Sequence, residues 1–319
     1  MDVSEIVKAY GAYYEKSAAN KSRVRKLLTQ GLETPKHCTL IKTDDTIYRL
    51  AQVTLGSIVQ SFQIGWTPGN EAAFTPNELR LHHFKVDTEI SPDQIEDTWL
   101  SFLSSHSVSR QDWPLVRYLI EEVYVPMINS DMELLEYGKG VYQAPVPGTA
   151  SVTGQGMNGL ISQLRAGIDD ETINHISLSP LTTSNIFDQV ELFVDGISQV
   201  YQNQTMSIFM SPQWARAYLR DRRSQGFYTI SSEREVSLAV DFTPQSIVSL
   251  PCLSGTNVIF STPRANLIHL TKKAANKTQF KIEEYHRLVS FFADWWEGLG
   301  FGLNAAVWTN LNKTVVEEN

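Results

Sequence analysis

The sequence has few of the features that mark secreted, disulfide-stabilised or membrane-spanning proteins. Only two of its 319 residues are cysteines, Cys38 and Cys252, and they lie far apart. Such a pair fits buried free thiols in a reducing compartment better than a disulfide framework. No stretch approaches the roughly 18–20 consecutive apolar residues that a spanning helix needs. The first six residues lack the basic start and apolar run of a signal peptide, so none is expected.

The chain also lacks an excess of positive charge. Its 27 lysines and arginines are outnumbered by 35 aspartates and glutamates, giving a net charge of −8. This balance argues against a protein that reads nucleic acid, although not against one that only encloses it. A hydrophobic fraction of 42% is ordinary for a globular protein. The length suits one large domain or two ordinary ones.

No set of residues has the spacing of a catalytic or metal site. The histidines show neither H-x-x-x-H nor H-E-x-x-H spacing. The stretch from Gly154 to Gly159 matches G-x-G-x-x-G, but a proline-broken loop precedes it where a dinucleotide site needs a buried strand. Cys252 follows a proline in an apolar setting, which favours a buried structural thiol over a nucleophile. We therefore expect no enzyme, no cofactor and no metal.

Apolar spacing and capping residues predict several helices. Residues 1–30 form the first, and its basic patch suits either a solvated face or an arm lying on a neighbour or facing nucleic acid. Ser91-Pro92 begins the second, and Asp112 begins the longest, which Pro126 should kink or divide and Gly138 and Gly140 should end. The loop 141–160 is the best internal boundary, and 185–201 is an amphipathic helix.

Alternating and short apolar runs predict the strands. These are 38–41, 47–50, 61–66, 73–76, 79–87, 208–210, 236–240, 246–250, 257–260 and 302–308, with 280–296 either a long strand or a strand-helix mixture. The segments around Thr67-Pro68-Gly69-Asn70 indicate a hairpin with a Pro-Gly turn at its tip. A two-stranded ribbon is only marginally stable in water and leaves open edges, so we expect it to contact another subunit.

Two groups of residues are candidates for subunit contacts. The first is the hairpin tip, with Trp66, Pro68 and Phe74. The second comprises the arginines of a basic helix after Ser211-Pro212, namely Arg216, Arg220, Arg222 and Arg223. An aromatic block around Trp295-Trp296 could line a ligand pocket, but such blocks more often form a core or an interface.

The order of several segments resembles the major capsid proteins of tailed phages, which have the Hong Kong 97-type fold. These segments are Met206–Gly226, Leu250–Pro263, Asn266–Leu270, Phe291–Phe301 and, earlier in the chain, Val123–Gly140. The style of His83–Asp87 and Phe291–Phe301 is most similar to capsid proteins of phages infecting Bacteroidetes. No single motif carries the resemblance; the order of many weak ones does.

The resemblance implies an α+β fold with five parts. It places an N-terminal arm at 1–45, an extended E-loop at 46–90, a peripheral domain with a spine helix at 91–145, an axial domain at 146–275 and return strands at 276–319. The lysine–asparagine crosslink of some relatives is not matched here, because Lys85 has no identifiable partners.

The resemblance further implies a structural protein that forms pentamers and hexamers of an icosahedral shell around phage DNA. Its partners would be itself and scaffolding, portal and decoration proteins, with non-specific proximity to DNA and no membrane. It would be made in the bacterial cytoplasm and reside in the virion. Two alternatives stay open: an encapsulin-like compartment, and a small-molecule-binding protein or enzyme with its site near Trp295-Trp296.

Overall fold

The computed structural model describes residues 32–54, 59, 61–65, 73–226, 238–273, 279–285 and 288–313. The predicted helix over 1–30 lies outside these residues. The strands are β1 (Thr39–Lys42), β2 (Ile47–Thr54), β3 (Ala73–Arg80), β4 (His82–Ile90), β5 (Asn174–His175), β6 (Ser207–Met210), β7 (Ser246–Ser249), β8 (Phe260–Thr262), β9 (Leu267–Thr271), β10 (Gln279–Tyr285), β11 (Leu288–Phe301) and β12 (Trp308–Thr309).

The α-helices are α4 (Pro92–His106), α5 (Leu115–Tyr118), α6 (Val125–Asp131), α7 (Leu160–Asp169), α8 (Ile186–Asp195), α9 (Gln199–Gln202) and α10 (Pro212–Ser224). Two π-helical turns, η3 (Leu119–Tyr124) and η4 (Met132–Glu136), continue α5 and α6. Short 3₁₀ turns are η2 (Thr34–His37), η5 (Pro251–Leu253), η6 (Arg264–Asn266) and η8 (Asn304–Ala306). No helix in the described ranges is long and apolar enough to cross a membrane.

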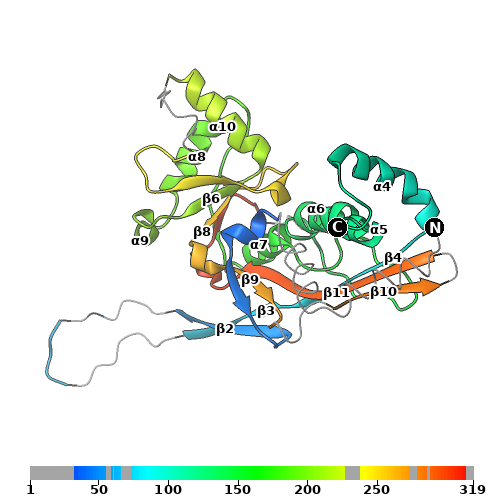
Figure 1. Ribbon diagram of the computed structural model, residues 1–319. Coiled ribbons are helices and arrows are strands. Elements are labelled where there is room, and N and C mark those ends of the chain that lie inside the picture. The colour runs from blue at the N-terminus through cyan, green and yellow to red at the C-terminus, as the bar shows by residue number, and fades with distance from the viewer. Residues whose placement is uncertain are drawn as a thin grey trace, which may run out of the picture.

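The larger sheet is organised around β11, its longest strand (Figure 1). β4 and β10 both pair antiparallel with residues 289–294 of β11. Because one stretch of a strand can pair with only one neighbour on each side, β4 and β10 lie along opposite edges of β11. β9 pairs with the far end of β11, and β1 pairs parallel with β9. Val289, Phe291 and Ala293 of β11 are buried and lie on one face of the sheet, since side chains alternate across a strand.

A long helix from Leu115 to Glu136 covers the buried face of this sheet (Figure 1). Tyr124 stacks on Phe291 of β11, with ring centroids 5.0 Å apart. The helix begins at Leu115, after Pro114, and not at Asp112 as predicted. The prediction that Pro126 kinks or divides the helix needs refining, because Tyr124 and Val125 keep helical dihedrals. The chain accommodates the proline with the preceding π turn, where the Val125 N–H bonds to the Ile120 carbonyl.

A smaller sheet, ordered β5-β12-β8-β6-β7, carries α8 and α10 and has its own core. The predicted single helix over 185–201 is wrong, because the chain leaves the helix at Gly196 and resumes at Gln199 as α9. Phe187, Val190 and Phe193 are buried as predicted, but Val200 is exposed because it lies beyond this break.

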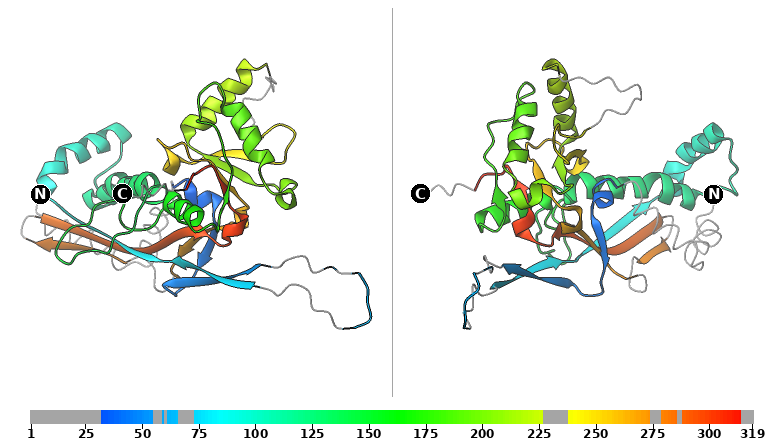
Figure 2. Two further views of the ribbon diagram at one scale, coloured as in Figure 1. Left: turned by 180° about the vertical axis from the view of Figure 1, so that it is seen from behind. Right: turned by 90° about the vertical axis from the view of Figure 1, so that its left-hand side faces the viewer.

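The β2–β3 ribbon projects away from both sheets, as the two views of Figure 2 show. Ile47–Thr54 pair antiparallel with Ala73–Arg80 over eight residues. β4 follows after Leu81 but joins the larger sheet, so the alternating segment 79–87 serves two sheets. At this change of partner Leu81 is buried, and its N–H still bonds to the carbonyl of Thr46, the residue before β2.

Other predicted strands differ in detail. The segment 280–296 is an antiparallel pair, β10 and β11, rather than one strand or a strand-helix mixture. The predicted strand over 302–308 is limited to β12 at Trp308–Thr309, since η8 intervenes. In 236–240 the described residues form only a bridge at Ala239, and the strand expected at 257–260 begins at Phe260. The strands at 38–41, 47–50, 208–210 and 246–250 are confirmed within a residue or a few.

Candidate subunit-contact surfaces

The outer part of the ribbon exposes apolar side chains. Val59, Phe62 and Ile64 are 93%, 95% and 97% exposed. Burying a phenylalanine or isoleucine is worth about 1.5–3 kcal/mol, so these residues gain nothing from the isolated fold. Phe62 and Ile64 were not among the predicted contacts, although apolar residues at i and i+2 lie on one face of an extended chain. These three side chains therefore add no apolar burial to the described part of the subunit.

The structure describes little of the three predicted tip residues. Trp66 and Pro68 lie outside the described residues. The backbone of Phe74 lies in β3, opposite Val53 of β2. The predicted strand over 61–66 is wrong for Ser61–Gly65, which are described and are not in a strand. The contact role of Trp66, Pro68 and Phe74 stays a prediction.

The arginines of α10 divide into two groups. Ser211 caps this helix by accepting a hydrogen bond from the Trp214 N–H, as its Ser-Pro start suggests. Arg216, Arg220 and Arg223 lie on the exposed side. Arg222 is half-buried, and its guanidinium bonds to Asp241 at 2.6 Å. Arg222 therefore pairs with another segment of its own subunit. The other three arginines are exposed, and Arg216 bonds locally to the Pro212 carbonyl at 3.1 Å.

The G-x-G-x-x-G stretch is occupied by the chain's own carboxylate. Glu136 is buried and accepts hydrogen bonds from the N–H groups of Gly154 (2.7 Å), Gly156 (3.1 Å) and Met157 (3.2 Å). Successive backbone N–H groups form a nest that binds anions, and here the anion is a side chain. The stretch is a loop, as predicted, and it secures residues 154–157 to the end of the long helix.

The neighbouring Glu133 fixes a second segment in the same way. Its buried carboxylate accepts hydrogen bonds from the Thr34 hydroxyl at 2.6 Å and from the Thr34 N–H at 3.2 Å. Cys38 and Cys252 lie in the adjacent core and are free, as predicted. Burial raises the pKa of Cys252 to about 12 and also raises that of Cys38, so both thiols stay protonated.

Trp295 and Trp296 do not line a common pocket. They are adjacent on β11, so their side chains point to opposite faces of the sheet. Trp295 stacks on Phe84, with ring centroids 5.5 Å apart, and Trp296 stacks on His83 at 4.5 Å. The aromatic pair serves as packing on both faces, which removes the geometric basis of the ligand-site alternative.

Beside Trp295 lies a buried, fully hydrogen-bonded carboxylate, Glu297. The Tyr137 hydroxyl and His269 Nε2 both contact its Oε1 at 2.5 Å, and the Trp295 indole N–H donates to its Oε2 at 3.1 Å. Burial alone would raise the pKa of Glu297, but hydrogen bonds from His269, Tyr137 and Trp295 outweigh it and lower the pKa. Burial, with Glu297 nearby, raises the pKa of Tyr137. The cluster joins the long helix to β9 and β11.

Among the described residues, no three His, Cys, Asp or Glu side chains gather in a way that could hold a metal ion. The described residues form packed and hydrogen-bonded clusters in the interior. Two surfaces, the ribbon end and the exposed side of α10, face outward.

Comparison with known proteins identifies solved structures with a similar fold. No family model matches the sequence, and no curated protein is a detectable relative. Solved structures do match. The fold is similar to a chain of the satellite phage P4 procapsid (TM-score 0.57, 11% identity), covering 98% of this chain and 99% of that one.

Two further structures are similar. One is the capsid of cyanophage A-1(L), with a TM-score of 0.52, 12% identity and coverage of 89% and 93%. The other is the SrpI encapsulin complex from Synechococcus elongatus, with a TM-score of 0.50, 12% identity and coverage of 89% and 90%. The chain therefore has a mixed α and β fold of the kind found in phage capsid proteins and in an encapsulin.

Replacing Glu136 with alanine should destabilise the fold by roughly 3 kcal/mol or more, because three backbone N–H groups lose their acceptor. The midpoint of urea unfolding measures this loss, and hydrogen exchange at residues 154–157 should rise at the same time. Glu122→Ala, at an exposed position of the same helix, is the matched control and should change stability by less than about 0.5 kcal/mol. Equal effects of the two variants would contradict the role given to Glu136.

The Glu297 cluster predicts a pH dependence of stability. Because the pKa of Glu297 is lower in the folded chain than the unfolded value of about 4.3, its ionised form stabilises the fold above that pH. This contribution is lost as the pH falls through the folded-state pKa. Glu297→Gln should be less stable than wild type at neutral pH and should lose less stability on acidification. Urea midpoints measured from pH 7 to pH 3 test this, and parallel curves for the two proteins would refute it.

Proposed function

We propose that this chain is a structural shell protein: a major capsid subunit that self-assembles into pentamers and hexamers of an icosahedral shell around phage DNA. The observation that carries the proposal is the end-to-end match to a phage P4 procapsid chain, which covers nearly the whole of both chains. The exposed Phe62 and Ile64 on a projecting ribbon support it, since such residues suit a protein that acts through contacts with its own copies.

The five-part division remains part of this proposal. The long helix and the larger sheet would form the peripheral domain, and the smaller sheet with α8 and α10 would form most of the axial domain. The two sheets do not follow the proposed boundaries, however. β1, β4 and β9 come from the proposed arm, E-loop and axial domain, but all three belong to the larger sheet. β12 comes from the proposed return strands but pairs with β8 of the smaller sheet. Scaffolding, portal and decoration partners and a Bacteroidetes host stay predictions.

An encapsulin-like compartment is the second candidate, favoured by the similarity to the Synechococcus encapsulin over about nine-tenths of both chains. The two candidates differ in what the shell holds. A cargo-enzyme gene beside this one, without terminase or portal genes, would favour the compartment, and particles that contain DNA would favour the capsid.

The first test is the solution mass of the purified chain, measured by light scattering over a range of protein and salt concentrations. We expect masses of multiples of the 36.0 kDa subunit, with rings, tubes or shells of five- or six-fold symmetry in negative-stain images. The −8 charge should make association weaker at low salt, where charges are screened least. A monomer under every condition would count against a shell protein.

The ribbon contact predicts the behaviour of a double variant, Phe62→Ser with Ile64→Ser. Both side chains are exposed in the subunit, so unfolding should be unchanged, while assembly should need at least about tenfold more protein because apolar contacts are lost. Val152→Ser, an exposed apolar position on the 141–159 loop, is the control and should assemble like wild type. Normal assembly of the double variant, or of a deletion of residues 65–74, would refute the ribbon contact.

A further inference from the structure

Helices α8 and α10 pack against each other and leave their outer sides uncovered within the described residues. Phe187 of α8 contacts Tyr218 of α10, with ring centroids 5.5 Å apart, and the Phe187 N–H donates to the buried Asp221 carboxylate at 3.0 Å. At the edge of this contact the exposed Gln225, just beyond the end of α10, bonds to the exposed Asp188 at 3.3 Å. Figure 1 shows the pair together on the lobe of the smaller sheet. Their inner faces are thus used inside the subunit.

The outer faces carry net charges of opposite sign along stripes of equal length, with three arginines on one and two aspartates flanking Leu192 on the other. The basic stripe is Arg216, Arg220 and Arg223 of α10, and the acidic stripe is Asp188, Leu192 and Asp195 of α8. All six residues are exposed, and each stripe follows the i, i+4, i+7 pattern of one helix face. With a rise of about 1.5 Å per residue, each stripe is about 10.5 Å long. The two stripes therefore match in length and are opposite in sign.

The acidic stripe carries excess negative charge. Glu191 lies beside it on α8, and its burial together with Asp188, Asp241 and Asp195 raises its pKa. Arg222, the cation that bonds to Asp241, is already engaged within the subunit. A carboxyl group with a raised pKa among other carboxylates is stabilised when a cation approaches.

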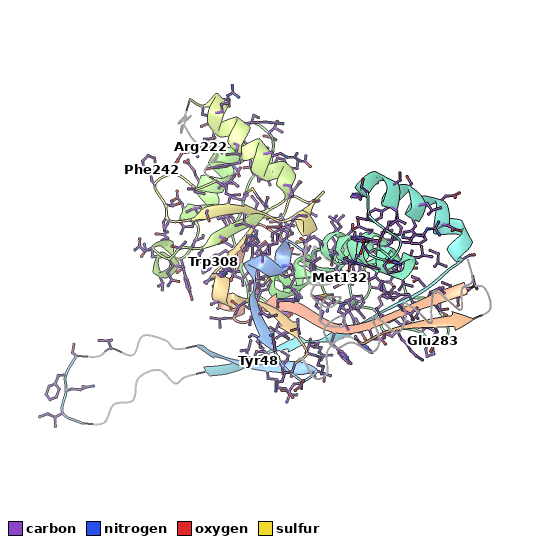
Figure 3. All side chains as sticks on the ribbon, viewed as in Figure 1. Tyr48, Met132, Arg222, Phe242, Glu283 and Trp308 are labelled. Carbon is purple, nitrogen blue, oxygen red and sulfur yellow. The ribbon has the colours of Figure 1, made fainter. Side chains whose placement is uncertain are left out.

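Phe242 adds an apolar anchor to the same region. It follows Asp241, is fully exposed, and has a left-handed backbone with φ of 60°. That conformation is strained for a bulky residue. The turn around it is closed by hydrogen bonds from the Thr243 N–H to the Val240 carbonyl and from the Val240 N–H to the Gln245 carbonyl. Figure 3 shows Phe242 and Arg222 together on the lobe of α8 and α10.

We infer that the basic stripe of one copy docks on the acidic stripe and Phe242 of the next copy, head to tail around a ring. The occupant is a second copy of this chain, because both complementary surfaces belong to one subunit. Using the basic stripe of one copy leaves its acidic stripe available to the next, which is the geometry of a closed ring. An arginine can also lie over the Phe242 ring. This inference rests on the proposed shell function and names the two surfaces of one of its contacts.

Charge reversal tests the pairing. Arg216→Glu with Arg220→Glu gives the basic stripe a net negative charge, although Arg223 remains, and Asp188→Lys with Asp195→Lys makes the acidic stripe basic. Each double variant should fold, since the changed side chains are exposed and the Asp188 change costs one exposed bond to Gln225. Each should fail to assemble at tenfold the concentration that suffices for wild type, because like charges then meet in the contact. The fourfold variant, with both stripes reversed, restores opposite signs and should assemble again.

An equal mixture of the two double variants gives a sharper result. Each variant can contact only the other, so copies must alternate around the ring. Rings with an even number of copies close and rings with an odd number do not. We expect the mixture to form hexamers but no pentamers, as measured by native mass spectrometry and negative stain. If the mixture assembled only because the charge changes of the two variants offset each other, both hexamers and pentamers would form.

Arg220→Glu and Arg165→Glu are matched controls, since they change the net charge equally and both positions are exposed on helices. Only Arg220→Glu should weaken assembly, and Phe242→Ser should weaken it without reducing stability. If wild type assembles and the reversed variants do too, the stripe contact is refuted while the shell function stands. If wild type itself remains a monomer under every condition, the result counts against the shell function and the stripe contact alike.

Discussion

The structure depends on the hydrogen bonds made by the last turn of the long helix. Within this turn Glu133 holds the chain at Thr34, Glu136 holds the loop at residues 154–157, and Tyr137 contacts Glu297 of β11. The turn is π-helical, with the Tyr137 N–H bonded to the Met132 carbonyl at 2.9 Å. Burying either carboxylate without its hydrogen-bond donors would cost free energy. The helix end, the loop and the sheet therefore form correctly only together.

That mutual dependence separates the chain into a fixed interior and outward-facing surfaces. Buried polar groups at the centre are paired with specific partners, which favours one arrangement of helix and sheet. The ribbon end and the stripes of α8 and α10 have exposed apolar or charged side chains that do not contribute to this interior. A chain built in this way can keep its shape while its exposed surfaces form contacts, as the proposed shell function requires.

Much of the fold followed from local sequence signals. Ser91-Pro92 and Ser211-Pro212 begin helices as predicted, because a proline at the first helical position loses no hydrogen bond. The long helix ends at Glu136, just before the predicted glycines, and a Cβ at Gly138 would lie 2.0 Å from the Cys252 carbonyl oxygen. The break at Gly196 was missed because the apolar spacing continues through it. Of the predicted arginines, Arg222 turns inward because Asp241, distant in sequence, lies beside it.

The sequence by itself determined the helix starts at Ser91-Pro92 and Ser211-Pro212 and the strands at 38–41, 47–50, 208–210 and 246–250, since spacing, capping residues and turn residues act within a few positions of each other. Its order of segments also indicated the fold class before any coordinates. Only the tertiary structure decided what each side chain does. It assigned Glu136 to the glycine-rich loop, placed the two tryptophans on opposite faces of a sheet, and exposed Phe62 and Phe242. The physical reason is that burial and electrostatic pairing depend on residues far apart in the chain, which local patterns do not encode.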